Sequence, residues 1–190
     1  MEKELRRNKI HRVQLEPLKA GTQELYCRLG EQAYRDHYLH LWPDRDPTPY
    51  ISTSFTQTIV SGETKDKTNL HYLVRLGTEY IGIVKLIKFH QINSISLQEP
   101  MYLEKIYFLS QYTGKGYGKE ILAEIEAISL QGKMKTLWLA TMKKGFPLRF
   151  YQNLGFEIIG EQELPFKESI PEQRGMYILG KSLRGAIESS

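Results

Sequence analysis

A strand that runs directly into a glycine-rich turn, and from there into an amphipathic helix, limits the possible folds of this chain more than any other feature. The strand covers residues 102–108 (YLEKIYF) and the turn covers residues 113–119 (TGKGYGK). Glycine at alternate positions lets a backbone turn tightly and approach a ligand closely. The first amides of the helix have no partner within it, and its dipole places positive charge at that end. The segment therefore predicts an anion site suited to a pyrophosphate; the alternative is a structural connection that binds nothing.

The spacing of the glycines separates this turn from the two common nucleotide-binding loops. A Walker A loop requires Ser or Thr after its lysine, and here Glu120 follows Lys119. The Rossmann fingerprint has the spacing GxGxxG at the start of a parallel unit. This turn reads GxGxG and follows strands that we expect to be antiparallel. Both of these motifs are therefore excluded.

The periodicity of the remaining chain predicts an α/β fold. Apolar residues form one stripe on the helix after the turn, at Tyr117, Ile121, Leu122, Ile125 and Ile128. Further helices are expected at residues 23–39, capped by Thr22, at 50–61, and at 147–154. Strands are expected at residues 11–18, 69–76, 79–87, 102–108, 136–141, 157–164 and 176–183, with a hairpin turn at Gly77-Thr78. We predict a single domain over residues 1–190, with a mixed, mostly antiparallel sheet of about seven strands and about four helices.

Composition excludes several other classes of protein. The chain has 190 residues, of which 41% are apolar and 25% are charged, so it can bury a core and is not disordered. Cys27 is the only cysteine, which excludes an intrachain disulfide and a thiolate zinc site. His37 and His40 have the spacing of metal ligands, but no third ligand follows them, and we predict no metal. The net charge of +4 does not require nucleic acid as a partner, and we expect none. No segment is apolar enough for a signal peptide or a membrane span, so we expect a cytoplasmic protein that does not bind a membrane.

Three segments together resemble the Gcn5-related N-acetyltransferase (GNAT) family. They are LEKIYF at residues 103–108, QYTGKGYG at 111–118 and FYQNLGF at 150–156. In that family the turn after the fourth strand binds the pyrophosphate of acetyl-CoA, and the FYxxxGF segment carries a helix beside the coenzyme. The first and third segments look closest to the bacterial polyamine (spermidine/spermine) acetyltransferases. The resemblance implies the GNAT fold for the chain, and acetyl-CoA as its co-substrate.

The resemblance also implies which residues contact the coenzyme. The end of the strand would pair with the pantetheine arm and the turn would hold the pyrophosphate, through Ile106, Tyr107, Phe108, Gln111, Thr113, Gly114, Lys115, Gly116, Tyr117, Gly118 and Lys119. The position that the family fills with Arg or Gln is Thr113 or Gln111, depending on which glycines are aligned. An Asn that the family often has seven residues before the helix tyrosine is Lys144 here, which could serve as a phosphate partner.

Two side chains are the candidates for catalysis. Tyr151 matches the tyrosine with which the family commonly protonates the leaving thiolate; the alternative is a packed aromatic residue with a satisfied hydroxyl. We expect Tyr151 to face the cleft while a neighbour on its helix faces the core. Glu104 lies in mid-strand, where it could accept the proton of a substrate ammonium group. The alternative for Glu104 is an ion pair with Lys85 or Lys105 on an exposed face.

The predicted function is direct transfer of an acetyl group from acetyl-CoA to a primary amine within a ternary complex. Because Cys27 lies in the first expected helix, away from the turn, we do not expect a cysteine acyl-enzyme. We expect His37, Tyr38 and Trp42 to line the acceptor pocket, and a homodimer is an expectation from the family alone. The alternative is a non-catalytic or regulatory protein that binds acetyl-CoA and transfers nothing.

Overall fold

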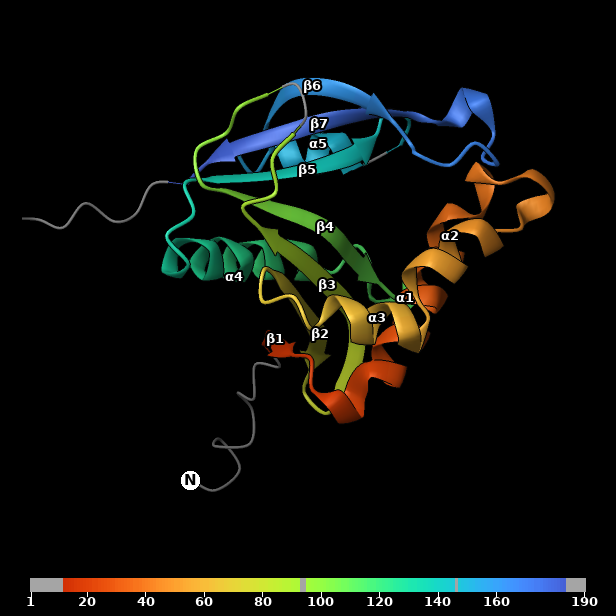
Figure 1. Cartoon of the computed structure of the whole chain (residues 1–190), viewed down its shortest axis with the longest axis horizontal. Coiled ribbons are helices and arrows are strands. Elements are labelled where there is room, and N and C mark those ends of the chain that lie inside the picture. Colours follow the sequence, from red (N-terminus) through yellow and green to blue (C-terminus); the bar gives the residue numbers. More distant parts are fainter. Residues whose placement is uncertain (1–11, 93–94, 146, 184–190) are drawn as a thin grey trace, which may run out of the picture.

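Seven strands of the described chain form one sheet, in the order β1-β2-β3-β4-β5-β7-β6 (Figure 1). This computed structural model describes residues 12–92, 95–145 and 147–183. The strands are β1 (Val13–Pro17), β2 (Asn69–Leu76), β3 (Glu79–Lys88), β4 (Pro100–Phe108), β5 (Thr136–Met142), β6 (Glu157–Glu163) and β7 (Gly175–Ser182). Neighbouring strands are antiparallel, except for the parallel pair β4 and β5. The predicted mixed, mostly antiparallel sheet is therefore confirmed, although His11, placed in the first expected strand, lies outside the described residues.

Within the described ranges there are five α-helices, one more than the sequence predicts. They are α1 (Gln23–Tyr38), α2 (Thr48–Ser54), α3 (Gln57–Glu63), α4 (Tyr117–Gln131) and α5 (Pro147–Gln152). The single helix predicted at residues 50–61 is wrong because the backbone of Phe55 leaves the helical region, at φ −128° and ψ 33°. Thr56 then caps α3 by accepting a hydrogen bond from the amide of Ile59 at 3.2 Å. Thr22 precedes α1 as predicted, but its hydroxyl donates to the carbonyl of Lys19 and makes no cap.

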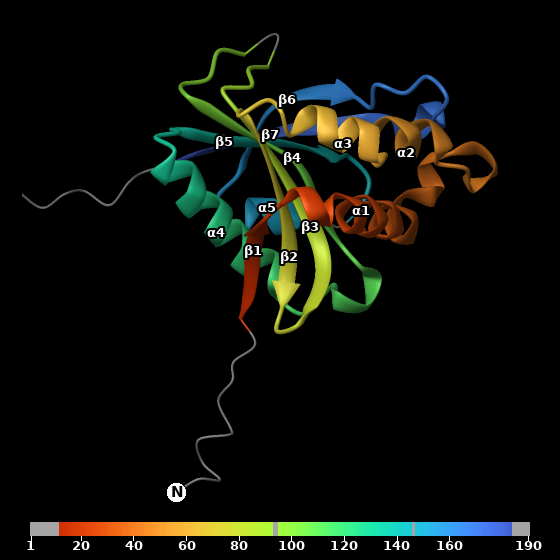
Figure 2. The same cartoon turned by 60° about the horizontal axis from the view of Figure 1, so that its bottom comes forward.

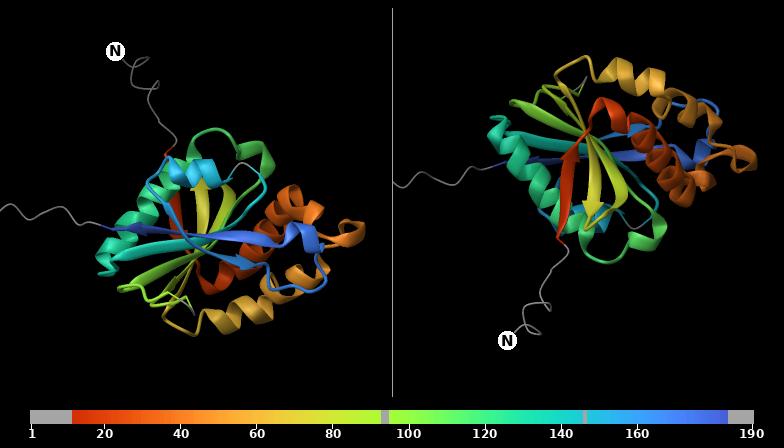
Figure 3. Two further views of the ribbon diagram at one scale, coloured as in Figure 1. Left: turned by 90° about the horizontal axis from the view of Figure 1, so that it is seen from above. Right: turned by 90° about the horizontal axis from the view of Figure 1, so that it is seen from below.

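The helices cover both faces of the sheet and enclose two apolar clusters. In Figures 2 and 3, α4 and α5 lie on one face and α3 lies on the other. Side chains of one strand alternate between the faces, so that Val84 of β3 belongs to the cluster under α4 and α5, whereas Ile83 belongs to the cluster under α1, α2 and α3. Ile121 and Ile125 on the predicted stripe of α4 are fully buried. No helix of the described residues has the length and apolar character that crossing a membrane requires.

The parallel strands β4 and β5 pair only where they begin. Their last paired residues are Tyr102 and Trp138, and beyond this point no register joins the two strands in the described structure. Figure 1 shows them side by side at one end and diverging toward the other. The backbone of β4 from Leu103 to its end therefore has a neighbour, β3, on one edge only.

A β-bulge in β4 lies two residues after the last residue paired with β5. Lys105 pairs with Lys85 and Leu103 pairs with Leu86, so Glu104 is an extra residue without a partner in β3. A bulge of this kind bends a strand and increases its twist. The bend at Glu104 explains why β4 turns away from β5, and it places the GNAT-like segment of β4 on an open edge of the sheet.

Candidate active site

The turn between β4 and α4 presents a row of backbone amides. Gly114 and Gly116 have φ angles of +70° and +87°, which glycine adopts without a steric penalty. Among the described residues, no acceptor bonds the N–H groups of the five successive residues from Gly114 to Gly118. A Cβ built at Gly114 or Gly116 would meet no atom within 4 Å, so the space beside the turn is open. The turn thus has both the donors and the room that a pyrophosphate needs.

Gly118 contributes its amide to this row, while its lack of a side chain serves packing. It lies in the first turn of α4, where a Cβ would be only 3.2 Å from Cζ of Phe150 on α5. Beside this contact lies a cavity of about 320 Å³, lined by Lys119, Arg149, Phe150, Asn153 and Leu154. Within the described chain, neither of its two cationic side chains takes part in an ion pair. Positive charge therefore continues from the amide row into the groove between α4 and α5.

The other side chains predicted to contact the coenzyme differ in whether they are hydrogen-bonded within the protein or exposed. The Thr113 hydroxyl donates to the carbonyl of Ser110 at 2.8 Å, which ties it to its own turn. Gln111 is exposed in the 3-10 turn η4 (Ser110–Tyr112). The ammonium group of Lys115 lies 5.4 Å from the ring centroid of Tyr112, and Lys144 is exposed in the connection between β5 and α5. The turn therefore depends on backbone amides, with lysines around it.

The end of β4 offers alternate backbone groups to its open edge. The amide of Leu109 donates to β3 at 3.0 Å, and the alternation of an antiparallel ladder then directs the amide and carbonyl of Tyr107 toward β3 as well. The backbone amides and carbonyls of Ile106 and Phe108 point away from β3, toward the open edge of β4. The carbonyl of Phe108 already accepts a hydrogen bond from Nε2 of His37 at 3.0 Å. Of the three predicted residues, Ile106 and the amide of Phe108 are available to a ligand, whereas Tyr107 takes part in ordinary strand pairing.

Tyr151 lies on α5 with its ring in the apolar core. Only 8% of the residue is exposed, and the ring makes edge contacts with Phe150 and Phe156. The ring of Tyr151 therefore packs in the core, and the expectation that Tyr151 faces the cleft stays a prediction for its hydroxyl. Its hydroxyl has no hydrogen-bond partner in the described part of the chain, yet it is not enclosed, because the only enclosed and unpartnered side-chain atoms there belong to Tyr26 and His71. Burial, and to a smaller extent the phenol of Tyr38, raise the pKa of Tyr151 well above its usual value.

Tyr38 belongs to a cluster of four tyrosines with Tyr34, Tyr50 and Tyr107. The ring of Tyr34 stacks on those of Tyr50 and Tyr38, with centroids 4.1 and 4.9 Å apart, and the hydroxyls of Tyr50 and Tyr107 are 2.9 Å apart. Burial raises the pKa of all four phenols, so they remain protonated at neutral pH.

The expected lining of the acceptor pocket is corrected at Trp42, whereas it stays a prediction at His37 and Tyr38. Trp42 is 2% exposed, and its indole N–H donates to the hydroxyl of Tyr34 at 3.0 Å, so it is a core residue. His37 holds the carbonyl of Phe108, as described above. Tyr38 alone of the three expected residues belongs to the tyrosine cluster.

Glu104 is part of a chain of buried and half-buried polar groups on the face of the sheet that α1, α2 and α3 cover. One of its carboxylate oxygens accepts a hydrogen bond from Lys105, and the other lies 2.6 Å from Nζ of Lys85. Lys85 also bonds Glu63 on α3 at 2.7 Å, and the second oxygen of Glu63 lies 2.9 Å from Nε2 of His71 on β2. Glu104 thus pairs with both lysines named in the alternative interpretation. The lysines are buried, however, whereas that interpretation placed the pair on an exposed face.

The two ammonium groups determine the ionisation of Glu104. Burial alone would raise its pKa, but the charges of Lys105 and Lys85 outweigh burial and hold the pKa below its usual value of 4.5. The pKa of Glu63 is likewise lowered to about 2, because the hydrogen bonds from His71 and Lys85 exceed the effect of burial. Both carboxylates are therefore ionised at neutral pH.

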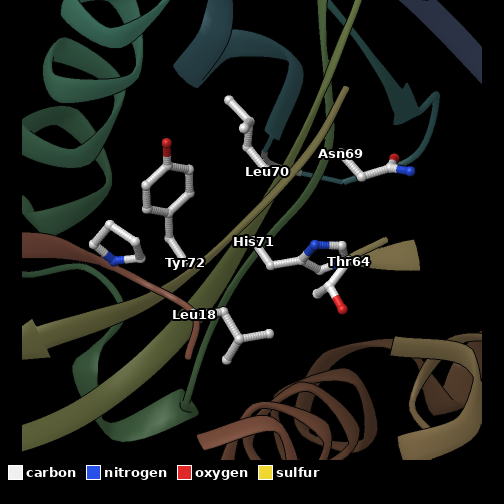
Figure 4. A pocket seen from close by; sticks show the side chains of 7 residues that line it. Leu18, Thr64, Asn69, Leu70, His71 and Tyr72 are labelled. Atoms are coloured by element: carbon white, nitrogen blue, oxygen red, sulfur yellow. The ribbon is translucent and has the colours of Figure 1, made fainter. Parts of the chain in front are cut away.

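His71 ends this chain of groups at a surface cavity of about 180 Å³. Figure 4 shows His71 near Thr64 in the wall of this cavity, while Leu70 and Tyr72 point to the other side of β2. Nδ1 of His71 is enclosed and has no partner in the described chain. The chain of groups was not predicted, although the sequence carries a signal for it, since His71, Lys85 and Lys105 are polar residues inside otherwise apolar strands.

Together, the diverging strands, the amide row and the basic cavity define an α/β protein suited to a phosphorylated ligand that enters the edge of its sheet. A family model described as the acetyltransferase (GNAT) family matches residues 31–156. The chain belongs to the acetyltransferase (GNAT) family, which confirms the predicted enzyme class.

Solved structures agree with this fold. The PaiA N-acetyltransferase of Thermoplasma acidophilum, in complex with coenzyme A, is 16% identical with a TM-score of 0.68, covering 90% of this chain and 98% of that one. A GNAT family acetyltransferase of Elizabethkingia anophelis with acetyl-CoA bound is 18% identical with a TM-score of 0.60, covering 92% and 100%. The ribosomal-protein-S18-alanine N-acetyltransferase of Escherichia coli is 14% identical with a TM-score of 0.62, covering 94% and 98%. At these identities the likeness shows the fold and does not select a substrate subgroup.

Proposed function

We propose that the protein transfers the acetyl group of acetyl-CoA directly to a primary amine. The row of unpartnered amides from Gly114 to Gly118, next to the open edge of β4, carries this proposal. The amides would bind the pyrophosphate, with Lys115, Lys119 and Lys144 neutralising its charge. Coenzyme A and acetyl-CoA in two structures of similar fold support this choice of ligand.

The amides of Ile106 and Phe108 would hold the pantetheine arm and so fix the position of the thioester. A ligand strand along the open edge of β4 would satisfy backbone groups that otherwise have no partner there. Holding the thioester beside the amine removes much of the entropic cost of a reaction between two molecules. His37 supports this edge, because its bond to the carbonyl of Phe108 fixes the last residue of β4.

Tyr151 would supply the proton that the thiolate needs as it leaves. Its raised pKa keeps the phenol protonated at neutral pH, and its hydroxyl is free of other partners in the described chain. When the amine nitrogen bonds to the carbonyl carbon and the carbon–sulfur bond breaks, the phenol would donate its proton to sulfur, and the second proton that the nitrogen then loses would restore the phenol through solvent. The buried ring would hold the hydroxyl in place during this step.

Glu104 would accept the proton that the substrate ammonium loses. Its side chain is 24% exposed, whereas those of Lys85 and Lys105 are 5% and 3% exposed, so a substrate can reach the carboxylate and not the lysines. Glu104 is ionised at neutral pH and can therefore receive a proton. An acyl-enzyme on Cys27 has less support, because burial raises the pKa of this thiol to about 11 and disfavours the nucleophilic thiolate.

A screen for release of coenzyme A with a panel of amines tests the proposal. The panel should contain spermidine and spermine, because of the motif resemblance, an arylalkylamine, because of the tyrosine cluster, and a peptide with a free N-terminal alanine. Calorimetric binding of acetyl-CoA with turnover of one amine is the expected result. Binding without any turnover would instead favour the non-catalytic alternative. The polyamine acceptor, the cytoplasmic location, the homodimer and the single domain over residues 1–190 stay predictions.

A further inference from the structure

Two buried lysines around one carboxylate require an explanation other than stability. A buried ion pair contributes little more than well-packed apolar residues of the same size, because removing each charge from water is costly. Here Lys85 and Lys105 are both 4% exposed, and they converge on Glu104. The arrangement therefore points to a task that involves Glu104.

We propose that Lys85, Lys105 and Glu63 are positioning residues that fix the orientation and the charge of Glu104 for proton transfer. The inference rests on the proposed function, in which Glu104 receives the substrate proton. Each lysine holds one carboxylate oxygen, so that the rotation of the carboxylate is fixed at the bulge of β4. Glu63 in turn holds Lys85, and His71 holds Glu63.

The bulge explains why this carboxylate needs support. An extra residue in a strand lacks the ladder partners that normally orient its side chain. The bulge also sends Glu104 and Lys105 to the same face of the sheet. There Nζ of Lys105 lies 6.0 Å from the ring centroid of Phe55 and contacts Glu104. Without its two ammonium partners, burial would favour the neutral, protonated form of Glu104.

The titratable groups around Glu104 come from every element packed against it. They are Lys85 on β3, Lys105 and Tyr102 on β4, Tyr26 on α1, Tyr50 on α2 and Glu63 on α3, with His71 of β2 behind Glu63. The tyrosines carry no charge at neutral pH. The two lysines are thus the cations that hold Glu104 ionised, and Glu63 is the nearby anion that opposes them by sharing Lys85.

This balance of charges gives variants with effects of opposite sign. Lys85→Met removes a cation and should raise the pKa of Glu104 by about 1–3 units. Glu63→Gln removes an anion, so that Lys85 pairs with Glu104 as its only carboxylate partner, and the pKa of Glu104 should fall. Lys85→Arg keeps the charge and should keep the pKa low. Shifts of opposite sign would show that Lys85 and Glu63 set the charge of Glu104, and the kinetic measurement below separates this role from a merely structural one.

The pKa can be measured without any substrate, by a carbon-13 NMR titration of the glutamate carboxylates in the full chain. The signal of Glu104 is identified by its loss in Glu104→Gln. Lys181→Met is the matched control, because Lys181 bonds Glu126 at 2.6 Å in a half-buried pair elsewhere in the protein, and it should leave the signal unchanged. If Lys85→Met does not fold, Lys105→Met removes the other cation. An unchanged midpoint in every folded lysine variant would overturn the inference.

Kinetics supply a second measurement. With acetyl-CoA and the fastest amine of the panel, the acidic limb of kcat/KM should move to higher pH in Lys85→Met and return in Lys85→Arg. An equal loss of kcat/KM at every pH would show a structural role and overturn the inference. Failure to bind or turn over acetyl-CoA would contradict the proposed function alone, since the NMR titration does not depend on it.

Discussion

Replacement of Gly116 by valine tests the pyrophosphate site while leaving the fold intact. Gly116 has φ +87° and precedes α4, and a Cβ there meets no protein atom within 4 Å. The variant therefore has no clash to relieve, and its cost is the left-handed backbone, about 1–2 kcal/mol. For a chain of this size that cost lowers Tm by about 2–8 °C. The protein should stay folded.

The loss of ligand affinity should be far larger than the loss of stability. Hydrogen bonds to a charged group contribute about 1.5–3 kcal/mol each. If the valine side chain displaces the pyrophosphate from two amides, the loss is about 3–6 kcal/mol, or about 10²–10⁴-fold in Kd. Calorimetry with acetyl-CoA measures the affinity, and circular dichroism follows the fold.

Gly155→Val is the matched control for backbone strain. Gly155 has φ +84°, and a Cβ there would meet the flexible end of the Lys181 side chain, Cε at 3.6 Å and Nζ at 4.0 Å. This variant should lose a similar amount of stability and keep its affinity for acetyl-CoA. Unchanged affinity in Gly116→Val, or an equal loss of affinity in both variants, would refute the assignment of the amide row.

Three further predictions follow from the site. Protonation of a leaving group contributes about 10²–10⁴ in rate, so Tyr151→Phe should lower kcat by at least about tenfold, with little change in Tm or in acetyl-CoA affinity. The deficit should shrink with an acyl donor that has a better leaving thiolate, and an unchanged kcat in a chemistry-limited step would contradict the acid role. Glu104→Gln should lower kcat/KM most at neutral pH and recover in alkali, where free amine is abundant; a uniform loss would indicate a positioning role instead. Because the pKa of Glu63 falls from 4.5 to about 2 on folding, its ionised form stabilises the protein by about 3 kcal/mol above pH 4.5, and this contribution is lost as the pH falls toward 2. Urea denaturation at mildly acidic and strongly acidic pH should show a smaller difference in Glu63→Gln than in the wild type, and equal differences would argue against the low pKa.

The sequence determined most of the fold because its local signals agree with each other. Strand β2 has the bounds predicted from its apolar pattern, and Gly77 has the positive φ that its place in the hairpin turn requires. The stripe on α4 faces the core because its period matches the helix. The predicted amide row also depends on short-range geometry, since the glycines lie within five residues of each other.

Tertiary structure decided what depends on residues that are distant in the chain. The break at Phe55 was missed because the burial of its ring is a tertiary effect, while the pattern of residues 50–61 is compatible with one helix. The packing of the Tyr151 ring in the core was also decided by tertiary structure, because a six-residue helix such as α5 takes its rotation from its packing against α4.

Glu104 shows most clearly which properties the sequence determines and which depend on the tertiary structure. The sequence identified a carboxylate in mid-strand and its two possible partners, Lys85 and Lys105. It could not show that Glu104 forms a bulge, because a bulge is defined by the register between two strands. Nor could it show that Glu63, 41 positions earlier in the chain, shares Lys85 with it. The sequence specifies which side chains can ionise. The pKa of each one depends on which charges the fold brings close to it and on how far the fold removes that side chain from water.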